Sequence, residues 1–100
     1  MSEFVSVVRA KVKPGKREEV MKRIKLFHLP EGCSNYTTID TGGDTFCSFM
    51  IWDNQDALVA ARPAMIENLD QIRELLEELS PELGVTDPVS GPVTHQDLRA

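Results

Sequence analysis

Cysteine is scarce in this chain of 100 residues, which contains only Cys33 and Cys47. Two cysteines cannot form the disulfide framework of a small secreted domain, and they are too few and too far apart for a metal site. On the hairpin predicted below, about 16 Å along the strands would separate them, which exceeds the reach of a disulfide. We therefore expect two free thiols, no bound metal and a reducing, cytoplasmic location.

Long hydrophobic runs are also missing. The uninterrupted apolar segments extend over only a few residues, whereas a transmembrane helix needs roughly 20. The start of the chain lacks the cationic residues and the apolar centre of a signal peptide. Internal repeats and long linkers are absent as well. We expect a single domain over residues 1–100 that does not associate with membranes.

Basic residues are outnumbered, with 11 Lys and Arg against 16 Asp and Glu and a formal net charge of -5. This charge would repel the phosphates of a nucleic acid, so we expect no nucleic-acid partner. Many of the basic residues nevertheless gather between Lys11 and Lys25. This pattern is more typical of a solvated helix face, where Glu18 and Lys22 stand in favourable i,i+4 order, than of an anion-binding patch.

The apolar residues follow strand and helix periods in turn. Alternation predicts strands over residues 3–13, 35–40, 45–52 and 92–98. A first helix should follow Pro14-Gly15 and end near Leu29, because Pro30 disfavours helical geometry in the residue before it. A second helical segment should extend over 55–79 after an N-cap at Asp53 or Asn54, with a kink or break at Pro63.

Residues 41–44, Thr-Gly-Gly-Asp, are a strong hairpin signal. Pairing the flanking strands about this turn sets Tyr36 opposite Phe49. One face of the sheet would then carry Tyr36, Cys47, Phe49 and Ile51. The other face would carry Ile39, Phe46, Ser48, Met50 and Trp52. On this register Tyr36 would lie outside any cavity on the second face.

The order strand, helix, strand, strand, helix, strand predicts an α+β fold, the ferredoxin-like βαββαβ arrangement with an antiparallel four-stranded sheet. Both helices of such a fold cover the same sheet face. The other face would expose an apolar patch, either Val5, Val7, Phe49 and Ile51 or the opposite set, of a size that monomers rarely tolerate. The sequence therefore predicts a homodimer whose two sheets face each other, and it leaves open which face lines a cavity.

Three segments, residues 8–16, 30–36 and 52–58, resemble the antibiotic biosynthesis monooxygenase family, and the resemblance covers roughly residues 4–98. It implies a dimeric α/β barrel with a small cavity between sheet and helices in each protomer. Members include cofactor-independent oxygenases that act on quinols or polycyclic aromatics, haem-degrading enzymes, a sugar-phosphate isomerase and proteins with no established activity. Fold membership does not settle function.

Two departures from the family pattern concern haem and catalysis. The family often carries a histidine at the position of Ala61, and its haem-degrading members place an asparagine where this chain has Arg9. These departures predict that the chain binds no haem and uses no cofactor.

Cofactor-free oxygenation needs a pocket that binds an electron-rich aromatic molecule, favours its deprotonated form and excludes water. The candidate catalytic residues are His95, Arg9 and Asn35. The candidate substrate-binding residues are Phe27, Ser48, Met50, Trp52, Arg62 and Met65. His95 could serve as a base or proton shuttle, since the reference pKa of histidine lies near neutrality, but the pattern favours a half-exposed residue on an edge strand. Arg9 would either pair across the dimer or bind an anionic ligand.

Two functions therefore remain. One is a cofactor-independent monooxygenase that acts on a quinol or aromatic small molecule in the cavity between sheet and helices. The other is a non-catalytic homodimer that binds a small ligand or serves as a regulatory module. The family resemblance favours the first, and the small number of polar candidate residues favours the second.

Overall fold

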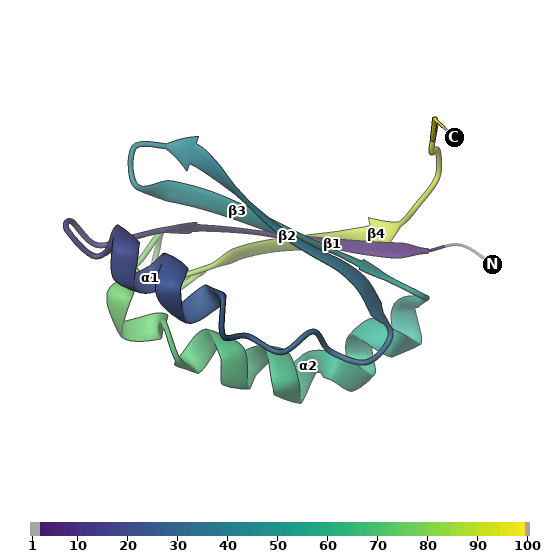
Figure 1. Ribbon diagram of the computed structural model, residues 1–100, viewed down its shortest axis with the longest axis horizontal. Helices are drawn as coiled ribbons and strands as arrows, with labels where there is room; N and C mark the ends of the chain where they lie inside the picture. Colours follow the sequence, from purple (N-terminus) through teal and green to yellow (C-terminus); the bar gives the residue numbers. More distant parts are fainter. Residues whose placement is uncertain (1–2, 100) are drawn as a thin grey trace.

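A computed structural model describes residues 3–99. Its elements are β1 (Phe4–Lys11), α1 (Arg17–Ile24), β2 (Cys33–Gly42), β3 (Thr45–Trp52), α2 (Gln55–Asp70), the 3-10 helix η1 (Arg73–Leu75) and β4 (Asp87–Pro92). The strands form one antiparallel sheet in the order β2-β3-β1-β4. The predicted ferredoxin-like topology, with β1 and β3 in the centre, is confirmed (Figure 1).

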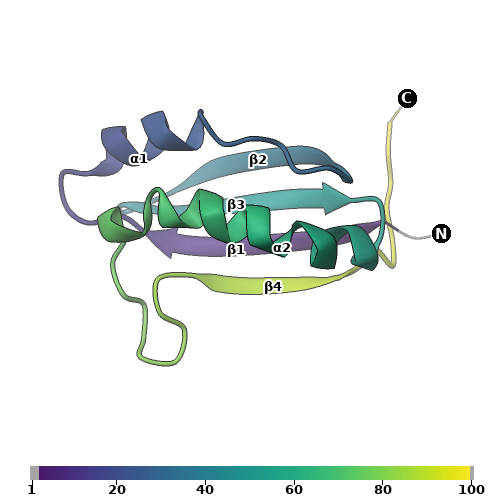
Figure 2. The same ribbon diagram turned by 90° about the horizontal axis from the view of Figure 1, so that it is seen from below.

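Both helices lie against one face of the sheet, and residues 3–99 supply no covering layer for the opposite face (Figures 1 and 2). Burial alternates along β3, where Phe46, Ser48, Met50 and Trp52 are buried and the residues between them are half-buried. The set that includes Ser48 and Met50 therefore faces the helices. Neither helix of residues 3–99 is long and apolar enough to cross a membrane.

The hydrophobic core consists of two clusters rather than one. The first joins the ends of β1 and β3 to α1 and η1 through Ala10, Val12, Val20, Phe46, Ile72, Leu75 and Leu76. The second joins the other ends of these strands to the start of α2 through Phe4, Cys33, Met50, Trp52, Leu58 and Ala61. The space between sheet and helices is thus packed at both ends, and its middle is left for a cavity.

The β2–β3 register differs from the prediction by one residue. Tyr36 pairs with Met50 instead of Phe49, and the turn consists of Gly43 and Asp44. Both turn residues have positive φ, 58° and 65°, as a type I′ turn requires. The pairing is irregular at Thr41, where a β-bulge shifts β2 along β3. Because a slip of one residue reverses the faces of a strand, Tyr36 points toward the helices, and the predicted placement was wrong.

The first helix ends at Ile24 and not near Leu29. The amides of Leu26 and Phe27 donate to carbonyls three residues back, at 3.0 Å each, which tightens the last turn and ends the α-helix. Phe27 therefore lies on an irregular segment, where the helical period no longer fixes its direction.

The second helix passes through Pro63 without the predicted break, and it ends at Asp70 instead of Leu79. Proline removes the amide that would donate to the carbonyl of Val59. Both Pro63 and Val59 are exposed, so water is available to that carbonyl. The predicted N-cap is confirmed at Asn54, whose side chain accepts a 2.9 Å hydrogen bond from the amide of Ala57.

The last strand is Asp87–Pro92 and not 92–98. It pairs with β1 alone, so it forms an edge of the sheet. An edge strand tolerates proline where its amide would face solvent, which explains how Pro88 and Pro92 belong to the strand instead of bounding it. Residues 93–99, including His95, lie outside the sheet.

Removal of a buried hydrogen bond by substitution tests this packing. The indole Nε1 of Trp52 donates to the hydroxyl of Ser6 at 2.9 Å, and both residues are buried. We expect Ser6→Ala to lower the free energy of unfolding by about 1–3 kcal/mol, because the indole N–H loses its partner away from water. Urea unfolding followed by Trp52 fluorescence measures the change.

The matched control is Ser90→Ala, because Ser90 is exposed and stands directly opposite Ser6 on β4. This control should change the unfolding free energy little. Equal effects of the two substitutions would contradict the importance of the Trp52–Ser6 bond.

Candidate functional site

A cavity of about 200 Å³ lies between the two core clusters, and we call it the inner chamber. The sheet forms its floor, and α2 with the segment after α1 forms its roof. Its lining comprises Val8, Ala10, Phe27, Pro30, Tyr36, Phe46, Ser48, Met50, Met65, Asn68, Leu69, Ile72, Leu76 and Thr86. Most of these side chains are apolar, so the chamber suits an apolar ligand.

The polar groups of the inner chamber are all uncharged at neutral pH. Ser48, predicted as the one polar group of this face, is buried, and its hydroxyl lies 2.8 Å from that of Thr38. The lining also includes Tyr36, Asn68 and Thr86. No carboxylate, amine, guanidinium, imidazole or thiol is among the lining residues. The chamber can therefore donate and accept hydrogen bonds but offers no strong base.

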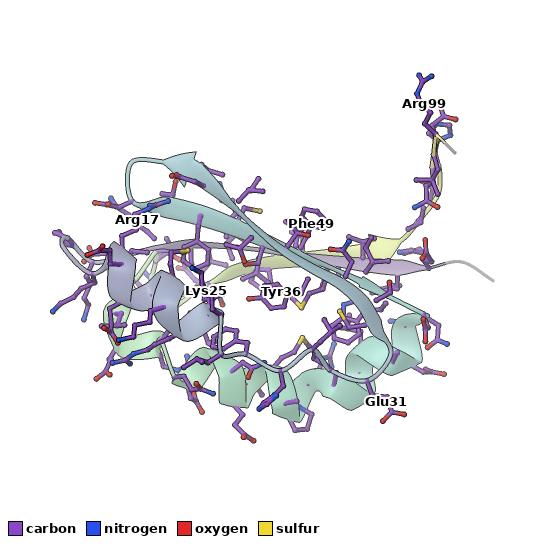
Figure 3. All side chains as sticks on the ribbon, in the orientation of Figure 1. Arg17, Lys25, Glu31, Tyr36, Phe49 and Arg99 are labelled. Atoms are coloured by element: carbon purple, nitrogen blue, oxygen red, sulfur yellow. The ribbon has the colours of Figure 1, made fainter. Side chains whose placement is uncertain are left out.

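A second hollow of about 290 Å³ adjoins the chamber, and we call it the outer groove. Its lining is Ile24, Phe27, Leu29, Tyr36 and Thr38. Phe27 and Tyr36 line both spaces, with ring centroids 6.4 Å apart in an edge-to-face arrangement. These two rings form the boundary between chamber and groove. Figure 3 shows Tyr36 directed from the sheet toward the helices, and Phe49 on the opposite face.

The structure brings four of the six predicted substrate-binding residues to the chamber, which are Phe27, Ser48, Met50 and Met65. The other two lie elsewhere. Trp52 is fully buried in the second core cluster and bonds Ser6, and Arg62 is exposed on α2.

The three predicted catalytic residues do not meet, and none lines the chamber. His95 follows the sheet with 82% of its side chain exposed, 3.6 Å from the carboxylate of Asp97. Arg9 points from the outer face and pairs with Asp87 of the neighbouring strand, whose hydrogen bond and charge raise the pKa of Arg9. Asn35 is exposed, and its side-chain oxygen accepts a 2.6 Å bond from Thr37.

Four polar residues of the chamber and groove were not among the predicted site residues, namely Tyr36, Thr38, Asn68 and Thr86. Tyr36 and Thr38 were misplaced by the register, since the bulge at Thr41 has no distinct sequence signal. Asn68 follows Met65 by three residues on the same face of α2, so helical periodicity could have identified it. Nothing in the sequence marks Thr86.

Both cysteines are free, as predicted. Cys33 is buried in the second core cluster, and its burial raises the pKa of the thiol. Cys47 is half-buried on the outer face. Among residues 3–99, no group of three or more His, Cys, Asp and Glu side chains is arranged to hold a metal ion.

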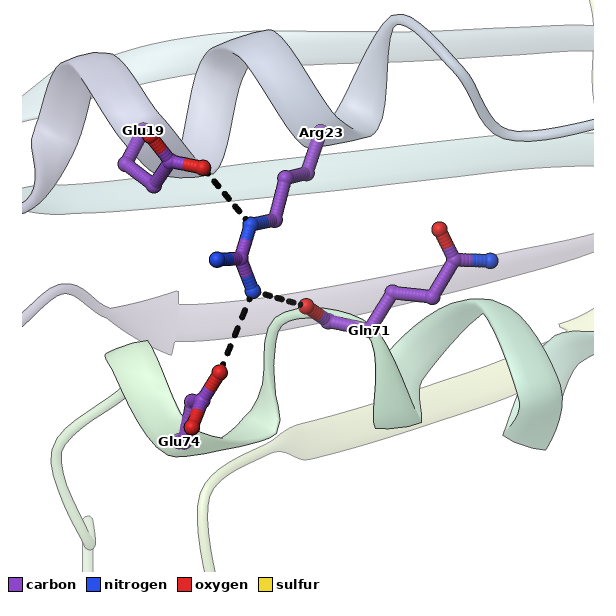
Figure 4. Close-up of polar contacts among 4 residues, drawn as sticks. All are labelled: Glu19, Arg23, Gln71 and Glu74. Atoms are coloured by element: carbon purple, nitrogen blue, oxygen red, sulfur yellow. Dashed lines mark hydrogen bonds and ion pairs between the residues drawn. The ribbon is translucent and has the colours of Figure 1, made fainter.

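Arg23 connects α1, which leads into the chamber roof, to the end of α2 (Figure 4). Its Nε donates to Glu19 at 2.8 Å, and its Nη1 donates to the carbonyl of Gln71 at 2.7 Å and to Glu74 at 3.2 Å. The Gln71 carbonyl follows the last turn of α2, where carbonyls lack helical donors. Since α1 fully buries only Val20, these polar contacts help to fix its position and that of Phe27.

Because Arg23 pairs with Glu19, we expect the contribution of this contact to the stability of the fold to depend on pH. The hydrogen bond and charge of Arg23 lower the pKa of Glu19 below its ordinary 4.5. A carboxyl group with a lowered pKa stabilises the fold above its ordinary pKa and loses this effect as the pH falls through the folded value. Arg23→Gln should therefore destabilise the protein modestly at neutral pH, and the difference from the wild type should shrink below pH 4.5.

Urea unfolding of both proteins across this pH range measures the difference, and Arg62→Gln on the exposed side of α2 is the control. A difference that does not change with pH would contradict the Glu19 pairing.

No protein-family model and no curated protein sequence matches the chain. Solved structures do. SnoaB, a cofactor-independent oxygenase from Streptomyces nogalater, solved as a point variant, is 16% identical with a TM-score of 0.68, over 96% of this chain and 97% of its own. A proposed antibiotic biosynthesis monooxygenase from Nitrosomonas europaea is 14% identical with a TM-score of 0.75, over 94% and 92%.

A dimeric ferredoxin-like protein from an uncultured marine organism is 8% identical with a TM-score of 0.75, over 100% of this chain and 95% of its own. These similarities establish a shared fold and support the resemblance to the antibiotic biosynthesis monooxygenases. At such identities the chemistry of the chamber has to be judged from its own residues.

Proposed function

We propose that the inner chamber binds an uncharged aromatic small molecule, such as a quinol, and that the protein acts on it as a cofactor-independent monooxygenase. The observation that carries the proposal is the apolar chamber with hydroxyl groups on one side, at Tyr36, Ser48 and the adjoining Thr38. Apolar walls hold the rings, and hydroxyl groups recognise the oxygen of a phenol or quinol.

The reaction needs only oxygen and the substrate. A quinol that becomes a hydroxyquinone takes one oxygen atom into a new C–O bond, and the other atom leaves as water. The substrate itself supplies all four electrons. The protein's task is then to exclude water and to stabilise the ionised substrate, which reacts with oxygen more readily than the neutral form.

The Thr38–Ser48 pair is suited to this task. The two hydroxyls share one hydrogen bond, so whichever of them donates, the other keeps its own proton for a ligand. Together with the phenol of Tyr36, the chamber side therefore offers two donors to a substrate oxygen. Because no base lines the chamber, the substrate proton has to pass to water at the outer groove.

The alternative is a non-catalytic protein that binds the same class of ligand. The absence of an acid, amine or imidazole among the lining residues favours it. Both functions place the ligand in the same chamber, so they differ only in whether oxygen is consumed.

Oxygen uptake with a panel of quinols and anthrones separates the two. For an oxygenase, Tyr36→Phe and Ser48→Ala should each lower kcat/KM by about 10- to 100-fold, since a hydrogen bond to a charged group is worth about 1.5–3 kcal/mol. His95→Ala and Arg9→Ala should leave the rate unchanged, because both residues lie outside the chamber. Binding of the panel without uptake above the buffer rate would instead support the non-catalytic function.

We also propose that a second copy of the chain covers the outer face of the sheet. The register places Val5 beside Ile51, and Val7 between Phe49 and Val89. Val89 is 62% exposed. These side chains form a continuous apolar patch on the face that the helices leave bare, and a partner sheet would remove it from water.

Phe49→Asp should convert a dimer to a monomer, because it places a charge in the centre of the covered patch. Light scattering at micromolar concentration measures the mass. The control is Ile66→Asp, since Ile66 is an apolar residue of α2 that is 55% exposed. A monomeric wild type, or a dimer that Phe49→Asp leaves intact, would exclude this interface.

A further inference from the structure

The size of the inner chamber limits what it can enclose. An apolar cavity of about 150 Å³ accepts benzene in an engineered protein. At about 200 Å³, the chamber has room for one or two rings, and a larger molecule has to extend beyond it. The outer groove, which adds about 290 Å³, is the space that adjoins the chamber through shared residues.

The outer groove is apolar although it opens to solvent. Ile24, Phe27 and Leu29 provide most of its wall, and Leu29 is 56% exposed. None of the groove residues carries a charge, so the groove suits an uncharged chain rather than a phosphate or a carboxylate. Because Phe27 and Tyr36 line both spaces, a molecule that passes around this pair of rings can cover both surfaces.

The boundary between the chamber and the groove determines which part of such a molecule lies in each space. The rings of Phe27 and Tyr36 form this boundary and pack edge to face, with centroids 6.4 Å apart. Beneath them Thr38, which lines the groove, bonds Ser48, which lines the chamber. A ring oxygen held by these hydroxyls would leave the rest of the ring in the chamber and direct a substituent outward.

We propose that the ligand has two parts, a one- or two-ring phenol or quinol head in the inner chamber and an uncharged apolar tail in the outer groove. The packed rings of Phe27 and Tyr36 form the edge over which the tail leaves the chamber. This inference rests on ligand binding in the chamber, which belongs to the proposed function, and adds a second subsite to it.

A series of 4-alkylphenols, from phenol to hexylphenol, tests the proposal by isothermal titration calorimetry on the full chain. The affinity of the wild type should rise with each methylene, by up to about fourfold, because burial of one methylene is worth about 0.8 kcal/mol. Leu29→Trp, which fills the groove, should abolish this gain and leave the affinity for phenol unchanged.

Two controls complete the design. Leu26→Trp changes a neighbouring side chain that is 68% exposed and lines neither space, so it should retain the chain-length gain. Phe46→Trp fills the chamber and should abolish binding of the whole series. Circular dichroism checks that each variant is folded.

The possible results are distinguishable. Phenol binding without a chain-length gain, a gain that persists in Leu29→Trp, or binding that persists in Phe46→Trp would overturn the tail subsite and leave the oxygenase question open. If the wild type bound neither the phenols nor the quinol panel, the chamber would not be an aromatic site, and both proposals would fail.

Discussion

Strand β3 has to bury two apolar faces, and the rest of the structure depends on how it does so. Its helix-facing residues Phe46, Met50 and Trp52 are buried within the chain. Its outer residues Phe49 and Ile51 remain half-buried under no helix. A domain of this size has enough sequence for one covering layer, because α1 and α2 both lie on the same face. The first face therefore floors the inner chamber, and the second is the surface that we propose a partner covers.

The chamber exists because the helix layer packs at its two ends and not in its middle. The chamber opens to solvent, so its apolar walls keep a surface that remains in contact with water. The ligand that we propose would remove this surface from water, and the Ser48–Thr38 pair would give it a fixed polar contact.

The sequence predicts the parts of the fold that repeat a simple pattern. Alternation along β1 and β3 identifies two central strands and their two side-chain faces, and Met65 of α2, a predicted substrate-binding residue, lines the chamber. Prediction from the sequence fails where the local residues are compatible with two conformations. Gly42 and Gly43 allow the turn to form at neighbouring positions. A shift of the turn by one position moves the Tyr36 side chain to the other face of the sheet. Pro88 and Pro92 are compatible with both a strand and a loop, so β4 and His95 were misplaced. The partner of Arg9, Asp87, is 78 residues away and follows from topology alone.

The segments that the sequence predicts poorly include those that form the boundary between the inner chamber and the outer groove. Tyr36 is placed by the bulge in an edge strand, and Phe27 is placed by the early end of α1 and the contacts of Arg23. Edge strands and short helices with few buried side chains open more easily than the central strands do. The side of the chamber at Phe27 and Tyr36 is thus built by elements that general physical arguments make easier to open than the central strands of its floor. A ligand of the kind that we propose would then displace Phe27 and Tyr36 without disturbing β1 and β3, on which both the chamber and the outer face depend.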